Sequence, residues 1–170
     1  MTTKGIKVLK VSLGLYFLVG GVISLYFALT TLGLFGILQS LFPAIITTIV
    51  ISLFILSGYK YAFSESASAT LLMKISLWIQ SVQLVLLGLS FKNYFGPYFA
   101  VGFTDTPDFK FQIHIEPLIT WFGNGINKLS DEVSIVFNLI AVVLLILVYR
   151  IELAEEKLNA DLNGIDIGKG

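Results

Sequence analysis

The sequence predicts an all-α integral membrane protein: a four-helix transmembrane bundle with an extracytoplasmic β-hairpin insert between its third and fourth spans. The first reason is composition, because 56% of the 170 residues are hydrophobic and 13% are charged, about half of the ~25% usual in soluble domains. The second is the uncharged run from Val11 to Tyr59, which holds two crossings of roughly 20 helical residues each. The third is the strict alternation of apolar and polar residues from Phe109 to Glu116, which is typical of a strand.

The chain is expected to form a single membrane domain over residues 1–170. Its first connection should lie near Thr30–Pro43, because small and polar residues gather there and proline suits the first turn of a helix. Past the last span, the helix should continue into water and stop at Asn163-Gly164. The expected boundaries are spans at about 6–29, 43–62, 69–91 and 133–151, an outer insert at 92–130, an inner helix at 152–163 and a flexible tail at 164–170.

The distribution of positive charge predicts the orientation, because cytoplasmic segments of membrane proteins carry an excess of Lys and Arg. With both termini inside, the outer segments hold only Lys92, Lys110 and Lys128. The inner segments then hold Lys4, Lys7, Lys10, Lys60, Lys74, Arg150, Lys157 and Lys169. The sequence therefore predicts a multi-pass protein of the plasma (inner) membrane with a cytoplasmic N-terminus and C-terminus.

Two sets of residues inside the expected spans are candidate sites. Read as a helix, the third span places a polar seam on one face, and the fourth span adds one strongly polar interior residue. The seam and its addition are Ser76, Gln80, Gln83, Ser90 and Asn138. In the first span, small residues follow one another at steps of four, a spacing that lets a second helix approach closely in lipid. These candidate helix-packing residues are Gly20, Ser24 and Ala28.

The outer insert is expected to fold as a hairpin of 98–103 and 109–116 around a turn at Thr104–Asp108. In the expected register, Phe103 pairs with Phe109 and Ala100 with Gln112, and both strands then agree on which face is apolar. An isolated hairpin is barely stable in water, so this face needs a surface to cover it. It is the candidate interaction surface, formed by Phe99, Val101, Phe103, Phe109, Phe111 and Ile113.

The arrangement resembles a loose group of uncharacterised small bacterial membrane proteins with four spans. The shared features lie within 76–122: a third span with Gln80 and Gln83, an aromatic segment with glycine at 94–102, and an alternating strand at 109–115. The resemblance implies a four-span fold and brings no activity or site residues with it.

For function, the composition excludes several classes of site. The chain has no Cys and a single histidine, His114, which removes disulfides and thiolate ligands and argues against a His-based metal site. No catalytic residue, metal site, cofactor or nucleic-acid surface is predicted, and the sequence favours no enzymatic function. Besides the lipid bilayer, the expected partners are a membrane or extracytoplasmic protein or a second copy of the chain.

Two functional hypotheses stay open. The first is a structural or accessory membrane protein, in which Gln80, Gln83 and Asn138 form hydrogen bonds between helices and the hairpin or the inner helix contacts a partner. The second is a small oligomeric transporter or channel, in which the polar seam lines a path or a ligand pocket. Charged residues that couple transport to ions usually lie within the spans, and here the interiors hold none apart from Lys74 near one end.

Overall fold

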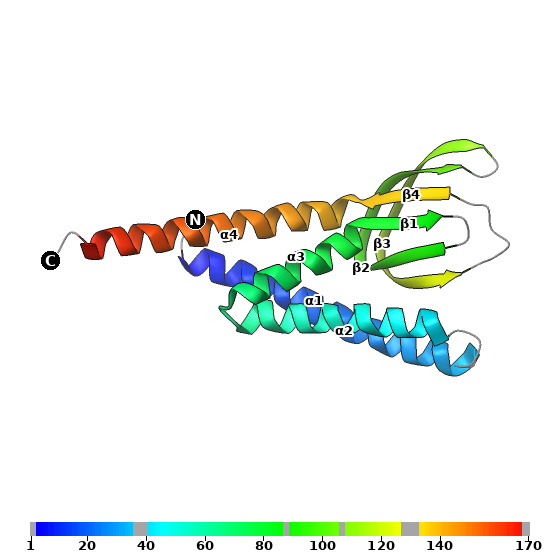
Figure 1. The fold of residues 1–170 in the computed structure, drawn as a ribbon, viewed down its shortest axis with the longest axis horizontal. Helices are drawn as coiled ribbons and strands as arrows, with labels where there is room; N and C mark the ends of the chain where they lie inside the picture. Colours follow the sequence, from blue (N-terminus) through cyan, green and yellow to red (C-terminus); the bar gives the residue numbers. More distant parts are fainter. Residues whose placement is uncertain (1–2, 36–40, 87–88, 106–107, 127–132, 168–170) are drawn as a thin grey trace.

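The computed structural model describes residues 3–35, 41–86, 89–105, 108–126 and 133–167, with four helices and a four-stranded antiparallel sheet among them. Figure 1 shows the sheet at one end of an elongated molecule, with both termini and the connection between α2 and α3 toward the other end. The helices are α1 (Thr3–Phe35), α2 (Leu41–Phe63), α3 (Ala67–Ser81) and α4 (Leu139–Ile167), and the strands are β1 (Val82–Leu86), β2 (Leu89–Asp105), β3 (Phe109–Ile126) and β4 (Val133–Asn138).

This architecture corrects the predicted all-α four-helix transmembrane bundle. Two helical segments, Thr3–Thr30 and Ala44–Phe63, are long and apolar enough to cross a membrane, and they correspond to the first two expected spans. The expected third span at 69–91 is instead α3, β1 and the start of β2, while the fourth at 133–151 is β4 followed by α4. The physical reason is that a run of apolar residues gives the same hydropathy in a strand as in a helix, and Val82–Leu86 and Val133–Asn138 are strands here because they pair with each other.

Helices α1 and α2 form an antiparallel hairpin whose helices approach closely at glycines. A side chain at Gly14 or at Gly58 would collide with the facing backbone, at 2.6 Å and 2.5 Å respectively, and one at Gly21 would meet Ile55 at 2.6 Å. Glycine lets two backbones approach in this way, which increases their van der Waals contact. At Gly14, Gly21 and Gly58 the two helices are therefore too close for a larger residue.

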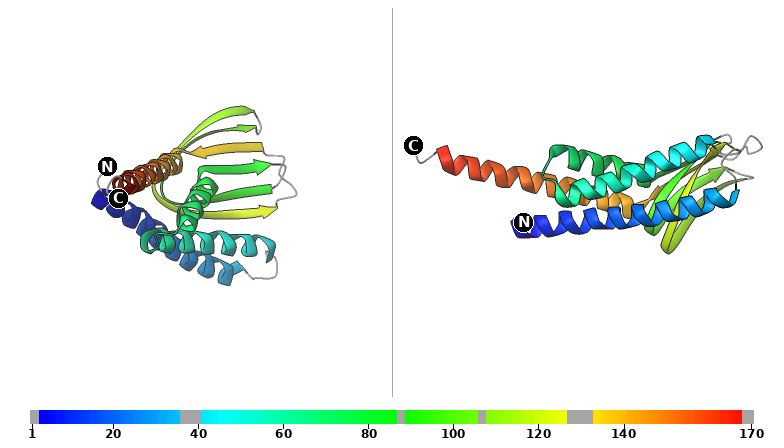
Figure 2. Two further views of the ribbon diagram at one scale, coloured as in Figure 1. Left: turned by 60° about the vertical axis from the view of Figure 1, so that its left-hand side comes forward. Right: turned by 90° about the horizontal axis from the view of Figure 1, so that it is seen from below.

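Helices α3 and α4 connect the helical part to the sheet without an intervening loop. The backbone turns from helical to extended at Val82, where β1 begins (φ −120°, ψ 128°), and β4 passes directly into α4. Because β1 and β4 pair with each other, with Gln83 opposite Val136, the two helices that extend from them also lie together. Figure 2 shows α4 continuing beyond the other helices at the end away from the sheet.

The sheet uses β2 and β3 twice, because this pair of strands bends back on itself. The first part of β2 pairs antiparallel with β1, β1 with β4, and β4 with the last part of β2. The two parts of β2 must therefore run in opposite directions, and β3 follows β2 on its far side throughout. The order across the sheet is thus β3 at 109–116, β2 at 98–105, β4, β1, β2 at 89–91 and β3 at 124–126. The C-terminal half of β3 lies beside α1 and α2, and its N-terminal half lies at the opposite edge (Figures 1 and 2).

The bend is at Gly96, where the pairing with β3 is irregular between Gly96 and Tyr98. Gly96 has a φ of +88°, which glycine adopts readily and other residues do not. A side chain there would also lie 2.1 Å from the Tyr16 hydroxyl, which donates a 3.0 Å hydrogen bond to the carbonyl oxygen of Phe95. The strands therefore fold back at the point where β2 contacts Tyr16 of α1.

The hairpin of β2 and β3 is much longer than the expected hairpin of 98–103 and 109–116, and its register differs by two residues. Ala100 faces His114 rather than Gln112, and Phe103 faces Phe111 rather than Phe109. A shift by two keeps every side chain on its expected face, because successive side chains alternate in a strand. The strands extend further into the expected turn than predicted, since Asp105 pairs with Phe109; residues 106–107 of that turn lie outside the described residues.

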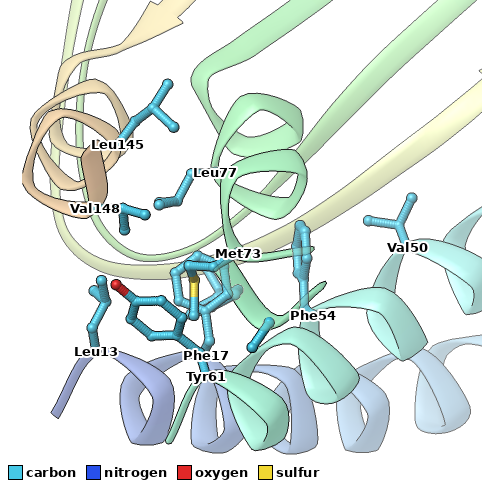
Figure 3. Packing of buried hydrophobic residues seen from close by; sticks show 11 residues of the cluster. Leu13, Phe17, Val50, Phe54, Tyr61, Met73, Leu77, Leu145 and Val148 are labelled. Carbon is cyan, nitrogen blue, oxygen red and sulfur yellow. The ribbon is translucent and has the colours of Figure 1, made fainter. Parts of the chain in front are cut away.

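The main hydrophobic core lies where the sheet meets the four helices. Phe95 of β2 inserts among the rings of Tyr16, Phe17 and Phe54, at centroid distances of 5.2, 5.2 and 5.5 Å. The close view in Figure 3 shows the side chains of α1, α2, α3 and α4 that converge on the same region. This core fixes the sheet at about the middle of α1.

Ion pairs hold the far part of α4 against the other helices. Lys10 of α1 lies 2.8 Å from Glu155, and Lys74 of α3 pairs with Glu152. Helix α4 continues to Ile167, past the stop expected at Asn163-Gly164. Of the expected tail, 168–170 lie outside the described residues.

Candidate functional site: the polar inner face of the sheet

The sheet has two unlike faces, and the polar face is the buried one. We call it the inner face; it carries Gln83 of β1, Ser134, Val136 and Asn138 of β4, and Tyr98, Ala100 and Thr104 of β2. All seven side chains are buried. Soluble sheets usually bury their apolar face and expose the polar one, so the polarity of this sheet is inverted.

Asn138, at the end of β4, has a clear structural role. Its side-chain oxygen Oδ1 accepts hydrogen bonds from the backbone N–H groups of Ile140 at 3.1 Å and Ala141 at 3.5 Å. Asparagine at this position caps the first turn of a helix, whose N–H groups have no partner within the helix. Asn138 therefore begins α4, and its oxygen is committed to the backbone.

Gln80 and Gln83 are the exceptional members of the expected seam. Their side chains are 2% and 4% exposed, and neither amide nitrogen Nε2 has a hydrogen-bond partner among the described residues. A buried donor without a partner costs about 1–3 kcal/mol of folding free energy. These two donors are the observation that points to a polar ligand or to water at the inner face.

Two stacked tyrosines lie beside Gln83. The rings of Tyr94 and Tyr98 are 4.1 Å apart and inclined by 12°. Gln83 is close enough to Tyr98 to interact with its side chain. A tyrosine hydroxyl is neutral at physiological pH, so this part of the site offers hydrogen bonds rather than charge.

The open rim of the inner face is formed by the N-terminal half of β3. His114 Nε2 lies 3.0 Å from Gln112 Oε1, and Glu116 pairs with Tyr98 across the strands. No group of three or more His, Cys, Asp or Glu that could hold a metal ion occurs in the described ranges. The arrangement supplies amide and hydroxyl groups, and we identify no nucleophile with an adjacent base in it.

The other residues of the expected seam are separated from this cluster by the change from helix to strand. Ser76, buried on α3, donates a 2.9 Å hydrogen bond to the Ser57 hydroxyl of α2. Ser90 lies on β2, opposite Val85 and Gly125. The structure thus brings Gln83 and Asn138 onto one face of the sheet, while Gln80 lies in the last turn of α3.

The candidate helix-packing residues of α1 have mixed surroundings. A side chain at Gly20 would lie 2.2 Å from the ring of Phe95, so this glycine makes room for the sheet. Ser24 is buried and donates a hydrogen bond to the carbonyl oxygen of Gly20, and Ala28 is half-buried. Sequence reasoning missed Phe95, although glycine and proline follow it directly and such a pair indicates a bend.

The opposite face of the sheet, which we call the outer face, is apolar and exposed. It includes all six residues of the candidate interaction surface: Phe99, Val101, Phe103, Phe109, Phe111 and Ile113. Val101 is half-buried and the other five are exposed, Phe109 to 70%. β1 and β4 extend this face through residues such as Leu84 and Ile135, which pair with each other and are also exposed. This extension was missed because β1 and β4 were expected to be helical.

A pocket of about 560 Å³ lies at the other end of the molecule, between α1, α2 and α4. Its lining includes Lys7, Lys10, Tyr61 and Glu155. Lys10 also lies 5.4 Å from the centre of the Tyr61 ring, so its charge is shared between an aromatic ring and a carboxylate. Since oppositely charged side chains occupy this pocket together, it carries no strong charge of either sign.

Comparisons with protein-family models, curated proteins and solved structures return no match.

Proposed function

We propose that this protein is an integral membrane protein with a structural or accessory role, which acts through contacts of its outer face within the membrane. The observation that carries the proposal is the inverted polarity of the sheet, in which the buried face is polar and the exposed face is apolar. A solvent-exposed protein rarely leaves an apolar surface this continuous uncovered, whereas a sheet in lipid turns its apolar side chains outward.

The two candidate membrane helices support the same environment. In the most apolar 18-residue stretch of each helix, only 28% and 39% respectively is buried within the molecule. Most of their apolar surface therefore faces outward, for example at Val19, Val22 and Ile49. The bend of the sheet packs on Tyr16 and Gly20, near the middle of α1. If α1 crosses the membrane, the strands begin at mid-depth and extend toward the side away from the termini.

The charge distribution supports a cytoplasmic location for both termini. Most of the Lys and Arg residues assigned to inner segments lie in three places: before the apolar stretch of α1, near the connection of α2 and α3, and on α4. These places are at the end of the molecule away from the sheet (Figure 1). A single thiol at Asp108, an exposed position between β2 and β3, should react with a membrane-impermeant maleimide in intact cells. A thiol at Ser66, exposed at the opposite end, should not, and the reverse pattern would invert the proposed orientation.

The test of the outer face uses the absence of cysteine in this chain. Single Cys variants at each position of 109–116, spin-labelled in lipid vesicles, should show a period of two in their collisions with a lipid-soluble and a water-soluble relaxing agent. Phe111→Cys and Ile113→Cys should meet mainly the lipid-soluble agent, and Lys110→Cys and Gln112→Cys, the matched inner positions, mainly the water-soluble one. Water-accessible labels at the odd positions would overturn the proposal.

The orphaned amides of Gln80 and Gln83 favour a second candidate function, a binding site or path for a polar, uncharged ligand along the inner face. The two functions differ in whether this face is dry. Under the structural role, Gln83→Cys should be protected from small water-soluble thiol reagents. The matched variant Val136→Cys, on the facing strand, should be protected as well. Rapid reaction at both positions in the folded protein would favour the second function.

A further inference from the structure

The N-terminal half of β3, Phe109–Glu116, forms an open edge of the sheet. Its residues pair with β2 on one side, and no strand pairs with the other side among the described residues. The C-terminal half of β3 differs, because it lies beside α1 and α2 (Figure 2). Open edges are unfavourable in lipid, where backbone N–H and C=O groups cannot bond to water, and in water they promote strand addition.

The side chains along this edge are self-complementary. In antiparallel pairing with a second copy about a two-fold axis at Ile113, Lys110 lies opposite Glu116 of the other copy, twice per dimer. The same register places Gln112 opposite His114 and Phe111 opposite Ile115, so polar pairs with polar and apolar with apolar. We propose that Phe109–Glu116 pairs in this register with the same segment of a second copy, which makes one continuous sheet from two chains.

Neighbouring registers fit less well. An axis at Gln112 would place Asp108 opposite Glu116, two like charges, and like charges directly opposite destabilise a pair of strands. An axis between residues would set apolar side chains opposite polar ones and so mix the two faces. Pro117 follows the segment and has no backbone N–H to donate, which ends the pairing one residue after Glu116.

The register predicts one symmetric crosslink. Ile113 would face its own copy across the axis, at the 4.5–5.5 Å Cα separation of antiparallel pairs, which a disulfide spans. Ile113→Cys, an exposed position, should therefore give a disulfide-linked dimer under mild oxidation in the membrane. Phe111→Cys, exposed to a similar degree, should stay monomeric, because its two copies would be four residues apart in register, about 13 Å. Efficient crosslinking at Phe111 and not at Ile113 would overturn the register.

Charge reversal tests the pairing without a crosslink. Lys110→Glu and Glu116→Lys should each weaken the dimer about tenfold, measured as the dissociation constant of the full chain in mild detergent. The double variant restores both opposite pairs and should regain the parent value. Neither residue forms an ion pair within the described part of one chain, so the rescue reports on contacts between copies. A chain that is monomeric throughout, or a double variant weaker than either single one, would overturn the proposal while leaving the lipid-facing sheet intact.

Discussion

Phe95 and Gly20 offer the sharpest test of how the sheet is attached to the helices. Phe95 is 2% exposed and contacts three aromatic rings, so Phe95→Ala should cost about 3–5 kcal/mol of unfolding free energy. Gly20→Ala adds a Cβ atom 2.2 Å from that ring, and such overpacking should cost about 1–3 kcal/mol.

The two substitutions should not add, because the second fills part of the space that the first leaves. In the Phe95→Ala background the clash at Gly20 is absent, and alanine is about 0.5–1 kcal/mol better than glycine inside a helix. Gly20→Ala should then change sign, from destabilising in the parent to neutral or stabilising in the variant. The coupling between the two positions should reach about 2–3 kcal/mol.

The assay is reversible unfolding in detergent micelles, followed by circular dichroism for the four members of the cycle. Phe99→Ala is the matched control, because Phe99 lies on the same strand but is exposed on the outer face, and it should cost about 1 kcal/mol or less. If Gly20→Ala has the same effect in both backgrounds, Phe95 does not pack on α1 and the attachment described here is wrong.

Three further predictions concern the sheet. Cysteines at Ala100 and His114 should form an intrachain disulfide, detected by gel mobility before and after reduction, and cysteines at Ala100 and Gln112 should not. The opposite result would support the register expected from the sequence, in which Ala100 pairs with Gln112. Asn138→Ala should lower the free energy of unfolding by about 1 kcal/mol and Asn138→Asp by less, measured by denaturant titration; equal losses would argue against the cap. Gly96→Ala should cost about 2–4 kcal/mol on the same scale, because it combines a positive φ with a clash against a tyrosine hydroxyl; a stable variant would contradict the bend.

The sequence is most informative where one local pattern determines the structure. A long uncharged run predicted the helical hairpin of α1 and α2, and alternation over Phe109–Glu116 predicted a strand whose faces are as expected. The register was missed by two residues because the hairpin turn, part of which lies outside the described residues, is shorter than the five-residue turn that Pro and Asp suggested. A two-residue shift leaves the pattern of faces unchanged, so the pattern alone cannot detect it.

The sequence is least informative where distant segments decide the structure. Val82–Leu86 and Val133–Asn138 are apolar enough to read as parts of helices, and they become strands by pairing with each other across the intervening hairpin. The second segment did carry a signal, because Ser134, Val136 and Asn138 alternate with larger apolar residues that face outward. That signal has a period of two over only six residues, too few to outweigh a continuous helical reading.

The inverted sheet also changes what the seam can reveal about function. If Gln83 made an interhelical hydrogen bond, Gln83→Leu would leave its partner without a hydrogen bond and destabilise the protein. Among the described residues its Nε2 instead lacks a hydrogen-bond partner. Leucine therefore removes an unsatisfied donor as well as the contact to Tyr98, and two effects of about 1 kcal/mol each oppose one another. An unchanged melting temperature would therefore fit either function, and stability cannot distinguish them. Access of water-soluble reagents to the inner face can, because a path must be wet and a structural cluster need not be.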